Sequence, residues 1–499
     1  MNFAPVRGWF VRVWFWPTLI LLCLARLWVA SRVSLLPDEA YYWVWSRALA
    51  PGYFDHPPMV ALWIRLGTAL LGQTELGVRL LGPVSVLAGS VLIYRCVRDL
   101  LPQTGPAGAR MAALLMNATL FWGVASLAMT PDIPLLFFWV LSLWTLGRLV
   151  ATGQGVWWLA VGGAVGCAMV SKYSAALLPI GILLWMAGEQ QRHWWRSPWL
   201  YLGALLALLL FVPVIGWNAT HDWASFARQG GRVADFRPSR AVNYELELIL
   251  GQFAIATPVV AWLCVRGAWA AWLRRREQVP ALLAAMIWPG VILFVEHGLG
   301  DRVQANWPAV IYPAAVIAVA MQGTKSVRTW ANRGSWLGLC LGAVILAQFA
   351  FDLLPLPRNL VALPMRREAT QELVRHVAQI AGDAPYIASD NYGMAALLAW
   401  YLPDSIDVLA LGDRWREFNL PSADPVIRAR TGLLLLRAQR RPALAQNWAD
   451  KALIAQMPSF QGSQSLLLYR VQGVKPGSGW IDGAVMPKRI NFAPAAPQN

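Results

Sequence analysis

A polar stretch at residues 37–59 holds side chains that could do chemistry in an otherwise apolar chain. Asp38, Glu39, Asp55 and His56 fall within 19 positions of one another and are interleaved with aromatic residues. Acidic side chains beside a long apolar run are costly to desolvate, so they usually line a water-filled cavity or a functional site. A carboxylate in a partly desolvated cleft can take the proton from an acceptor hydroxyl. We therefore predict catalytic roles for Asp38 and Glu39, with general base as the role of Asp38.

The same two acids have a simpler interpretation as helix caps. Pro37-Asp38 precedes a helical-looking segment, residues 40–49. Acidic side chains favour the N-terminal end of a helix, where unpaired N–H groups point outward. Position alone does not separate capping from catalysis for Asp38.

The run Asp55-His56-Pro57-Pro58 predicts a stiff turn. Each proline fixes its own φ and restricts the residue before it, which would hold Asp55 and His56 in place. With His297, Asp55 could bind a divalent metal. A single histidine is more often structural, and both alternatives stay open.

Two further positions carry charge next to apolar runs. Asp132 follows Thr130-Pro131 and opens a long apolar run, so it is either a helix cap or a catalytic residue. Lys172 interrupts an apolar run, where a lysine is expensive unless it is paired or reaches the interface. A phosphate is one such partner. Arg228, Arg232 and Arg302 could add bidentate contacts to that phosphate.

Composition indicates a polytopic membrane protein. Of the 499 residues 57% are hydrophobic and 14% are charged, and mean hydropathy is +0.46. A soluble domain carries about 25% charged residues. The net charge of +16 would suggest nucleic acid in a soluble chain, but here short basic loops beside anionic lipid explain it better. Five cysteines without a CxxC pair indicate buried thiols.

A membrane-spanning helix needs about 20 apolar residues. We expect eleven spans, the first of which resembles a signal peptide but is long enough to remain as an uncleaved span. They cover residues 13–33, 76–97, 109–129, 133–152, 155–171, 174–188, 199–217, 248–268, 280–296, 307–322 and 336–353.

Loop charge predicts the orientation of these spans. Every second loop is basic and belongs in the cytoplasm, with Arg95, Arg192, Arg274 and Lys325 as examples. The N-terminus then lies inside and residues 34–75 lie outside. The outer side also receives the charged residues named above, together with Glu296 and Asp301. Four arginines in the outer loop 218–246 contradict the charge rule, and we interpret them as functional.

After Pro355 the pattern changes to alternating helices and strands. Helices are expected at 368–380 and 395–401, and strands at 384–390, 432–436 and 466–470. We therefore predict a transmembrane catalytic domain at 1–354 and a small extracytoplasmic α/β domain at 355–499, whose tail after Gly477 is loose. The fold class is mainly α.

The chain lacks the Walker A, GxGxxG, HExxH and GxSxG motifs. Nothing therefore indicates a nucleotide substrate, and an enzyme acting outside the cytoplasm needs a donor that is available there. A sugar linked to a lipid phosphate meets that condition.

Taken in order, these motifs resemble the polytopic GT-C glycosyltransferases. The resemblance is carried by Asp38-Glu39-Ala40-Tyr41-Tyr42-Trp43, Gly52-Tyr53-Phe54-Asp55-His56-Pro57-Pro58, Thr130-Pro131-Asp132 and Ser171-Lys172-Tyr173. Within that group the chain looks like the bacterial branch related to protein O-mannosyltransferases and lipid A aminoarabinose transferases, near the lipid A galacturonosyltransferases. The similarity extends over about residues 10–350. One departure is His56, which stands where the family has lysine.

The resemblance implies an inverting transfer of a sugar from a polyprenyl-phosphate donor, with the active site at the periplasmic face of the bacterial inner membrane. It also implies two juxtamembrane helices in the first outer loop. Asp38 and Asp132 would line the acceptor site, and Lys172 would lie near the lipid phosphate. The residues expected to bind the donor are Tyr53, Asp55, His56, Lys172, Arg228, Arg232 and Arg302.

Several alternatives remain open at this stage. The acceptor could be lipid A or lipopolysaccharide, another glycan, a lipid or a protein, and the sugar is undetermined. The sequence establishes no cofactor, and a divalent metal at Asp55 and His297 is an open alternative. A transporter or flippase of a lipid-linked or anionic substrate would also place charges among many spans. It would predict repeated broken helices near mid-membrane, and the sequence has no internal repeat.

Overall fold

The computed structural model describes residues 4–230, 238–354, 367–412, 414–415, 418–438, 447–458, 465–475 and 481–489. The chain forms two compact units. The first comprises Met1–Trp28, Asp55–Val60 and Leu81–Leu346, and the second comprises Val29–Phe54, Ala61–Leu80 and Ala347–Asn499. Most of the polar stretch that carries Asp38 therefore groups with the C-terminal part of the chain. The domain boundary at residues 354 and 355 stays a prediction.

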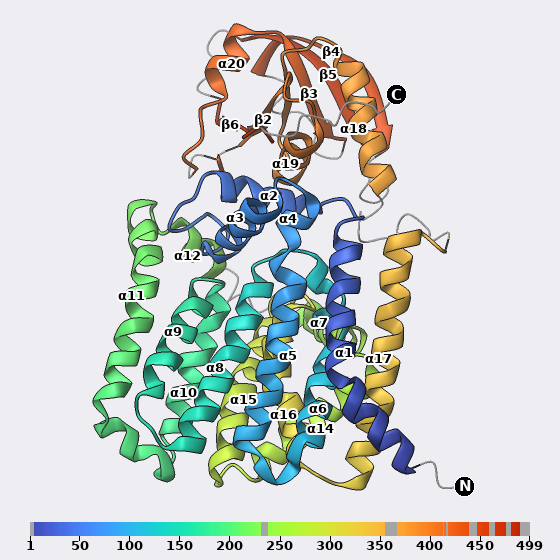
Figure 1. Ribbon diagram of the computed structural model, residues 1–499. Coiled ribbons are helices and arrows are strands. Elements are labelled where there is room, and N and C mark those ends of the chain that lie inside the picture. Colours follow the sequence, from blue (N-terminus) through green and yellow to red (C-terminus); the bar gives the residue numbers. More distant parts are fainter. Residues whose placement is uncertain are drawn as a thin grey trace. The chain divides into compact units, whose positions relative to one another are not determined.

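The first unit is a bundle of long apolar helices that run roughly alongside one another (Figure 1). Proline in the first turn starts several of them, because its fixed φ suits that position, and Gly153 ends α8 in the left-handed conformation. The helices are α1 (Ala4–Ala30), α5 (Leu81–Leu100), α6 (Gly105–Asn117), α7 (Leu120–Gly123), α8 (Asp132–Thr152), α9 (Trp157–Met169), α10 (Leu177–Met186), α11 (Pro198–Thr220), α12 (Ala224–Gly230), α13 (Pro238–Ala256), α14 (Pro258–Leu273), α15 (Gln278–Gly298), α16 (Tyr312–Met321) and α17 (Lys325–Phe351).

Five helices in the described ranges are long and apolar enough to cross a membrane, and two bent pairs raise that number to seven. The shorter apolar helices are Trp14–Ala30, Met59–Leu71, Trp157–Met169, Tyr173–Met186 and Trp307–Met321. Each of the eleven predicted spans falls on one of these helices or pairs. The chain is thus a multi-pass membrane protein, as predicted, while the number of spans stays a prediction.

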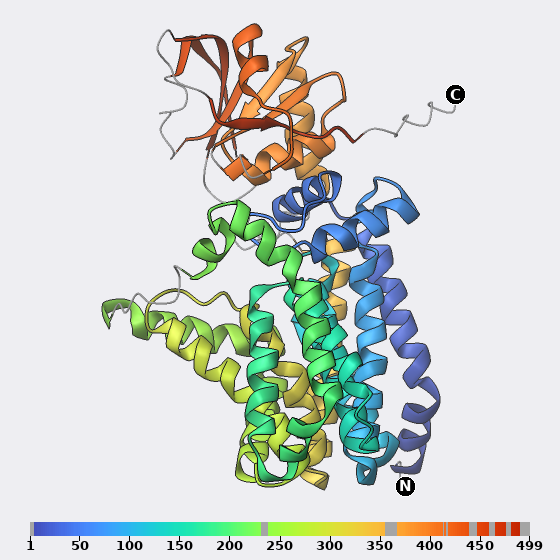
Figure 2. The same ribbon diagram turned by 90° about the vertical axis from the view of Figure 1, so that its left-hand side faces the viewer.

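Both bent pairs have distinctive local structure at the break. Between α6 and α7, which bend by 76°, Arg26 donates to the Gly123 carbonyl oxygen at 2.8 Å and to Asn117 Oδ1 at 3.2 Å. Asn117 in turn donates to Ser90 Oγ at 2.7 Å. Polar groups at the break therefore find partners inside the protein, as a bilayer requires. The pair α13–α14 bends by 109° (Figure 2). Thr257, between the two helices, has a φ of +66°.

Three short helices of the second unit come from the first loop: α2 (Pro37–Arg47), α3 (Met59–Leu71) and α4 (Glu75–Arg79). α2 and α3 match the two predicted juxtamembrane helices. α2 starts three residues before the predicted segment because Pro37 occupies its first turn, where the missing N–H is harmless. The remaining helices of this unit are α18 (Arg367–Ala381), α19 (Tyr392–Tyr401) and α20 (Asp424–Ala429).

A six-stranded sheet forms the core of the C-terminal part, within the ranges the structure describes. Its order is β4-β5-β3-β1-β2-β6, in which β3, β1 and β2 are parallel and the outer strands antiparallel. All four residues of β1 are buried, as expected for a central strand covered on both faces. The bounds are β1 Tyr386–Ser389, β2 Asp407–Leu411, β3 Gly432–Arg437, β4 Trp448–Pro458, β5 Ser465–Val474 and β6 Gly483–Val485.

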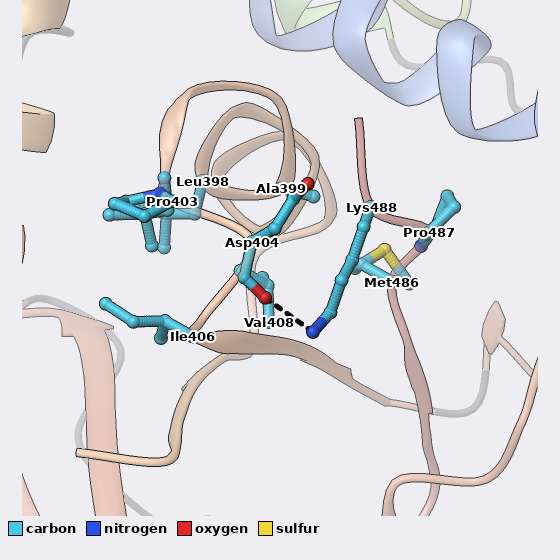
Figure 3. Close-up of a pocket in the computed structure, with 10 residues that line it drawn as sticks. Leu398, Ala399, Pro403, Asp404, Ile406, Val408, Met486, Pro487 and Lys488 are labelled. Atoms are coloured by element: carbon cyan, nitrogen blue, oxygen red, sulfur yellow. Dashed lines mark hydrogen bonds between the residues drawn. The ribbon is translucent and has the colours of Figure 1, made fainter. Parts of the chain in front are cut away.

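Side-chain contacts hold the segments on either side of β6. Lys488, after β6, donates to the Asp404 carbonyl oxygen at 2.6 Å beside Pro403 and Met486 (Figure 3). At α20, burial tends to raise the pKa of Asp424, but hydrogen bonds from Arg428 and from the Ile481 N–H outweigh it. The pKa of Asp424 is therefore lowered. Within the predicted loose tail, residues 481–489 are described and contain β6, which pairs with β2, and the other residues after Gly477 lie outside the described ranges.

Candidate active site

The second unit gives the neighbouring acids Asp38 and Glu39 different environments. Leu36 is the N-cap of α2, and Glu39 Oε2 accepts a hydrogen bond from its N–H at 2.9 Å. Capping thus falls to Glu39. Asp38 is exposed, and its Oδ1 accepts a hydrogen bond from the Tyr392 hydroxyl at 2.9 Å. Of the two carboxylates, Asp38 is the one that a substrate can reach.

Glu39 forms a buried ion pair with Arg79. The two side chains are 0% and 1% exposed, and their shortest N–O distance is 2.5 Å. Arg79 also donates to the carbonyl oxygens of Ala30, Val33 and Ser34 at 2.6–3.0 Å. These bonds anchor the chain between α1 and α2 and start α2 at a defined place. We infer a structural role for Glu39, and this geometry gives its predicted catalytic role no support.

Tyr53 also serves the local fold. Its hydroxyl donates toward the carbonyl oxygens of Trp45 and Ala48 and accepts from the Ala50 N–H, at 2.9–3.1 Å. Its ring stacks on Trp45 at 4.2 Å. Burial raises the pKa of this phenol well above its usual range, so the hydroxyl stays protonated. These contacts hold the end of α2 and do not by themselves indicate the predicted donor contact.

The first unit brings together two predicted residues and one that the prediction missed. Asp132 is the first residue of α8 and is 7% exposed. Its Oδ1 accepts a hydrogen bond from Lys172 Nζ at 2.7 Å, and its Oδ2 accepts one from Asn306 Nδ2 at 3.0 Å. Lys172 follows α9 and Asn306 precedes a short 3-10 helix at Trp307–Ile311. Three chain segments thus converge on one buried carboxylate.

Lys172 keeps binding capacity in this arrangement. An ammonium group has three N–H donors, and the bond to Asp132 uses one of them. The ion pair also offsets the unfavourable free energy of placing a charged lysine between apolar helices. Lys172 can therefore be held by Asp132 and still donate to a phosphate.

Asp55 lies in the predicted proline turn, which is fixed to the bundle. The Met59 N–H donates to the Val170 carbonyl oxygen at 3.1 Å, two residues before Lys172. Gln229 Nε2 donates to the Asp55 carbonyl oxygen at 2.7 Å. Arg228 Nε lies 3.9 Å from Asp55 Oδ1, and the arginine side chain is 42% exposed. Asp55 and His56 are half-buried, and the Arg228 guanidinium is a charged group beside Asp55.

The remaining predicted residues are more dispersed. Arg302 is 70% exposed and pairs with Glu247 at 2.6 Å. Buried His297 packs its ring 5.4 Å from that of Trp307. Among the residues that the structure describes, no group of three or more His, Cys, Asp or Glu side chains could hold a metal ion. Arg232 lies outside the described residues.

Comparisons with known proteins give a consistent result. Residues 55–217 match the family model described as dolichyl-phosphate-mannose-protein mannosyltransferase. A lipid A galacturonosyltransferase, RgtD, of Rhizobium johnstonii is 27% identical over 74% of this chain and 78% of its own length. An undecaprenyl phosphate-alpha-4-amino-4-deoxy-L-arabinose arabinosyl transferase of Pseudomonas fluorescens is 27% identical over 60% of this chain and 57% of its own length.

A solved structure shows the same fold. ArnT from Cupriavidus metallidurans in the apo state superposes with a TM-score of 0.62, at 17% identity, over 93% of this chain and 98% of ArnT. The same protein bound to undecaprenyl phosphate gives the same score over 92% of this chain. The resemblance that the motifs indicate is thereby confirmed: this chain has the GT-C fold and is similar in sequence to the polytopic glycosyltransferases of the protein O-mannosyltransferase and lipid A aminoarabinose transferase group.

Proposed function

We propose that this chain is an inverting glycosyltransferase that moves a sugar from a polyprenyl-phosphate donor to a hydroxyl or phosphate of an acceptor. The acceptor class that we favour is lipid A or lipopolysaccharide. The observation that carries the proposal is the sequence similarity to a lipid A galacturonosyltransferase over 74% of this chain. A glycan or a protein remains an alternative acceptor.

Asp38 is the proposed general base. It is exposed at the start of a helix whose other side chains are largely buried. In the proposed step, the acceptor hydroxyl gives its proton to this carboxylate. The acceptor oxygen bonds to the anomeric carbon as the bond from that carbon to the phosphate oxygen breaks. Polyprenyl phosphate leaves with the bonding electrons, so the transfer inverts the anomeric centre.

Lys172 is the proposed partner of the departing phosphate. Its bond to Asp132 holds the ammonium group in place, and preorganised charge of this kind stabilises a developing anion without reorganisation. Asp132 and Asn306 act through Lys172 in this proposal. Arg228 and Arg302 are the proposed additional anion contacts, and Asp55 and His56 the proposed contacts to the sugar.

We place the reaction at the periplasmic face of the bacterial inner membrane. The support is the charge of the loops: the basic loops alternate with those that carry the proposed site residues. Arg302 is exposed. In an Arg302→Cys variant, the introduced thiol should react with a membrane-impermeant thiol reagent added outside the inner membrane. Labelling only after the membrane is broken would reverse the assignment.

Mass spectrometry of glycolipids from cells with and without the gene tests the function most broadly. Cells with the gene should carry a sugar on lipid A or the lipopolysaccharide core that the deletion lacks. Complementation with Lys172→Met should not restore it, whereas complementation with the wild type should. Identical glycolipids in all strains would contradict the proposal.

The same experiment does not separate an enzyme from a flippase, because losing either could remove the modification. Purified protein in detergent does separate them, since no compartments exist there. An enzyme transfers the sugar from donor to acceptor under these conditions. A flippase leaves the donor unchanged.

A further inference from the structure

Two side chains from the C-terminal part of the chain lie beside Asp38 in the second unit. Tyr392 opens α19, and its hydroxyl donates to Asp38 Oδ1 at 2.9 Å. The guanidinium of Arg414 lies over the Tyr392 ring, 4.4 Å from its centre. Sequence motifs drew attention to neither residue.

The start of α19 is fixed against the start of α2. Asn391 caps α19 by accepting a hydrogen bond from the Met394 N–H at 2.9 Å. A side chain at Gly393 would collide with Pro37, so glycine allows the two helix starts to touch. The backbone at Tyr392 is therefore held in place, and this restricts where the Tyr392 hydroxyl can lie.

The far end of α19 is fixed as well. The Tyr401 hydroxyl accepts from the Leu35 N–H at 2.9 Å, and the Trp400 ring lies 5.0 Å from that of Trp43, edge to face. α19 is thus held at both ends against the chain around α2. A helix held in this way can aim one hydroxyl reproducibly.

Aromatic packing fixes the Tyr392 ring. The ring centre lies 4.7 Å from that of Tyr41, and Arg414 also faces the rings of Phe54 at 5.4 Å and Tyr41 at 5.7 Å. Arginine stacks on aromatic faces while its N–H edges stay available for other bonds. A cation beside a phenol also makes its O–H a stronger donor, because it favours the phenolate.

We propose that Tyr392 is a positioning residue for the general base Asp38 and that Arg414 holds and polarises it. The inference rests on the proposed role of Asp38. The hydroxyl bond orients the carboxylate toward the acceptor and favours its ionised form, which is the form that accepts a proton. The neighbouring acid Glu39 is paired with Arg79, whereas Tyr392 donates to Asp38 and Arg414 lies over the Tyr392 ring.

Tyr392→Phe tests the proposal because it removes the hydroxyl and keeps the ring. The variant, purified in detergent with the donor and acceptor identified by mass spectrometry, should lose about tenfold or more in kcat, the usual range for a hydrogen bond to a charged group. KM for the donor should stay unchanged. The acidic limb of the pH profile should move to higher pH by roughly one unit, because the carboxylate loses a bond to its ionised form.

Tyr401→Phe is the matched control on the same helix. It should lower the unfolding temperature and leave the acidic limb in place, since Tyr401 does not contact Asp38 in the described structure. Arg414→Gln should shift the limb in the same direction as Tyr392→Phe, and Arg414→Lys should restore part of the loss.

Normal kcat and an unmoved limb in Tyr392→Phe would overturn the proposal, as would a loss of activity that only follows unfolding. These outcomes can be distinguished from those expected if the proposed function itself is wrong. In that case the wild type itself would transfer no sugar, or Asp38→Asn would retain full activity.

Discussion

The adjacent acids Asp38 and Glu39 should respond to substitution in opposite ways, and Glu39→Gln is the more informative change. Glutamine keeps the shape of the side chain and removes its charge. Arg79 would then be a buried cation without its counter-ion. Its bonds to the carbonyl oxygens of residues 30, 33 and 34 would persist. These neutral groups would not replace the negative charge that Glu39 supplies.

The expected cost follows from the burial of the pair. Both side chains are at most 1% exposed, and two hydrogen bonds of 2.5 and 2.7 Å join them. Breaking a buried pair from one side typically costs about 3–5 kcal/mol. Glu39→Gln should therefore lower the unfolding temperature clearly, while transfer per folded molecule stays near that of the wild type.

Thermal unfolding in detergent, measured together with transfer activity, is the assay. In a double-mutant cycle with Arg79→Met the two substitutions should not be additive, because without Arg79 the loss of the Glu39 charge leaves no unpaired buried cation. If Glu39→Gln unfolds like the wild type, the structural role is wrong. A stable but inactive Glu39→Gln variant would return Glu39 to the catalytic set.

Three further outcomes follow from individual contacts. Asn306→Ala removes one hydrogen bond to the Asp132 carboxylate and should reduce kcat about tenfold, measured as sugar transfer, with donor KM little changed; unchanged kcat would remove Asn306 from the site. Arg228→Ala should raise the donor KM and leave the unfolding temperature within experimental error, because its ion pair with Asp55 is long and partly exposed; a large loss of stability would show a structural role instead. The pKa of Asp424 is lower in the folded than in the unfolded protein, so its ionised form stabilises the fold at pH values above the unfolded pKa of about 3.9. This stabilisation is lost as the pH falls through the lower pKa of the folded protein. Unfolding temperatures measured from about pH 6 to about pH 3 should fall more steeply for the wild type than for Asp424→Asn; parallel curves would contradict that assignment.

Local sequence signals predicted much of the scaffold. The apolar runs identify the helices, since each predicted span corresponds to an observed helix or bent pair. Pro131 before Asp132 marks the start of α8, and Pro57-Pro58 marks the turn before α3. These features depend on neighbouring residues, which a sequence displays directly.

The strands were predicted less completely. The expected segments 384–390, 432–436 and 466–470 coincide with β1, β3 and β5, but β2, β4 and β6 were missed. β4 carries a register shift between Leu453 and Ala455, and such a bulge interrupts the alternation of buried and exposed residues. β6 has three residues, too few for a period to appear.

Long-range partners could not be predicted at all. Tyr392 lies 354 positions from Asp38, Arg79 lies 40 positions from Glu39, and Asn306 lies 174 positions from Asp132. Nothing in the residues around either member of a pair indicates the other. The environments of Asp38 and Glu39 therefore became distinct only in three dimensions, although both acids occupy the first turn of the same helix.

Asp38 is the proposed base of a glycosyl transfer from a polyprenyl phosphate. The most direct test of this role compares purified wild type and Asp38→Asn in detergent, with conversion of a polyprenyl-phosphate sugar followed in the presence of lipid A. We predict that the wild type releases polyprenyl phosphate and forms the glycosylated acceptor, whereas Asp38→Asn forms no product at an unchanged unfolding temperature. Turnover by Asp38→Asn at the wild-type rate would contradict the role of Asp38 as the base.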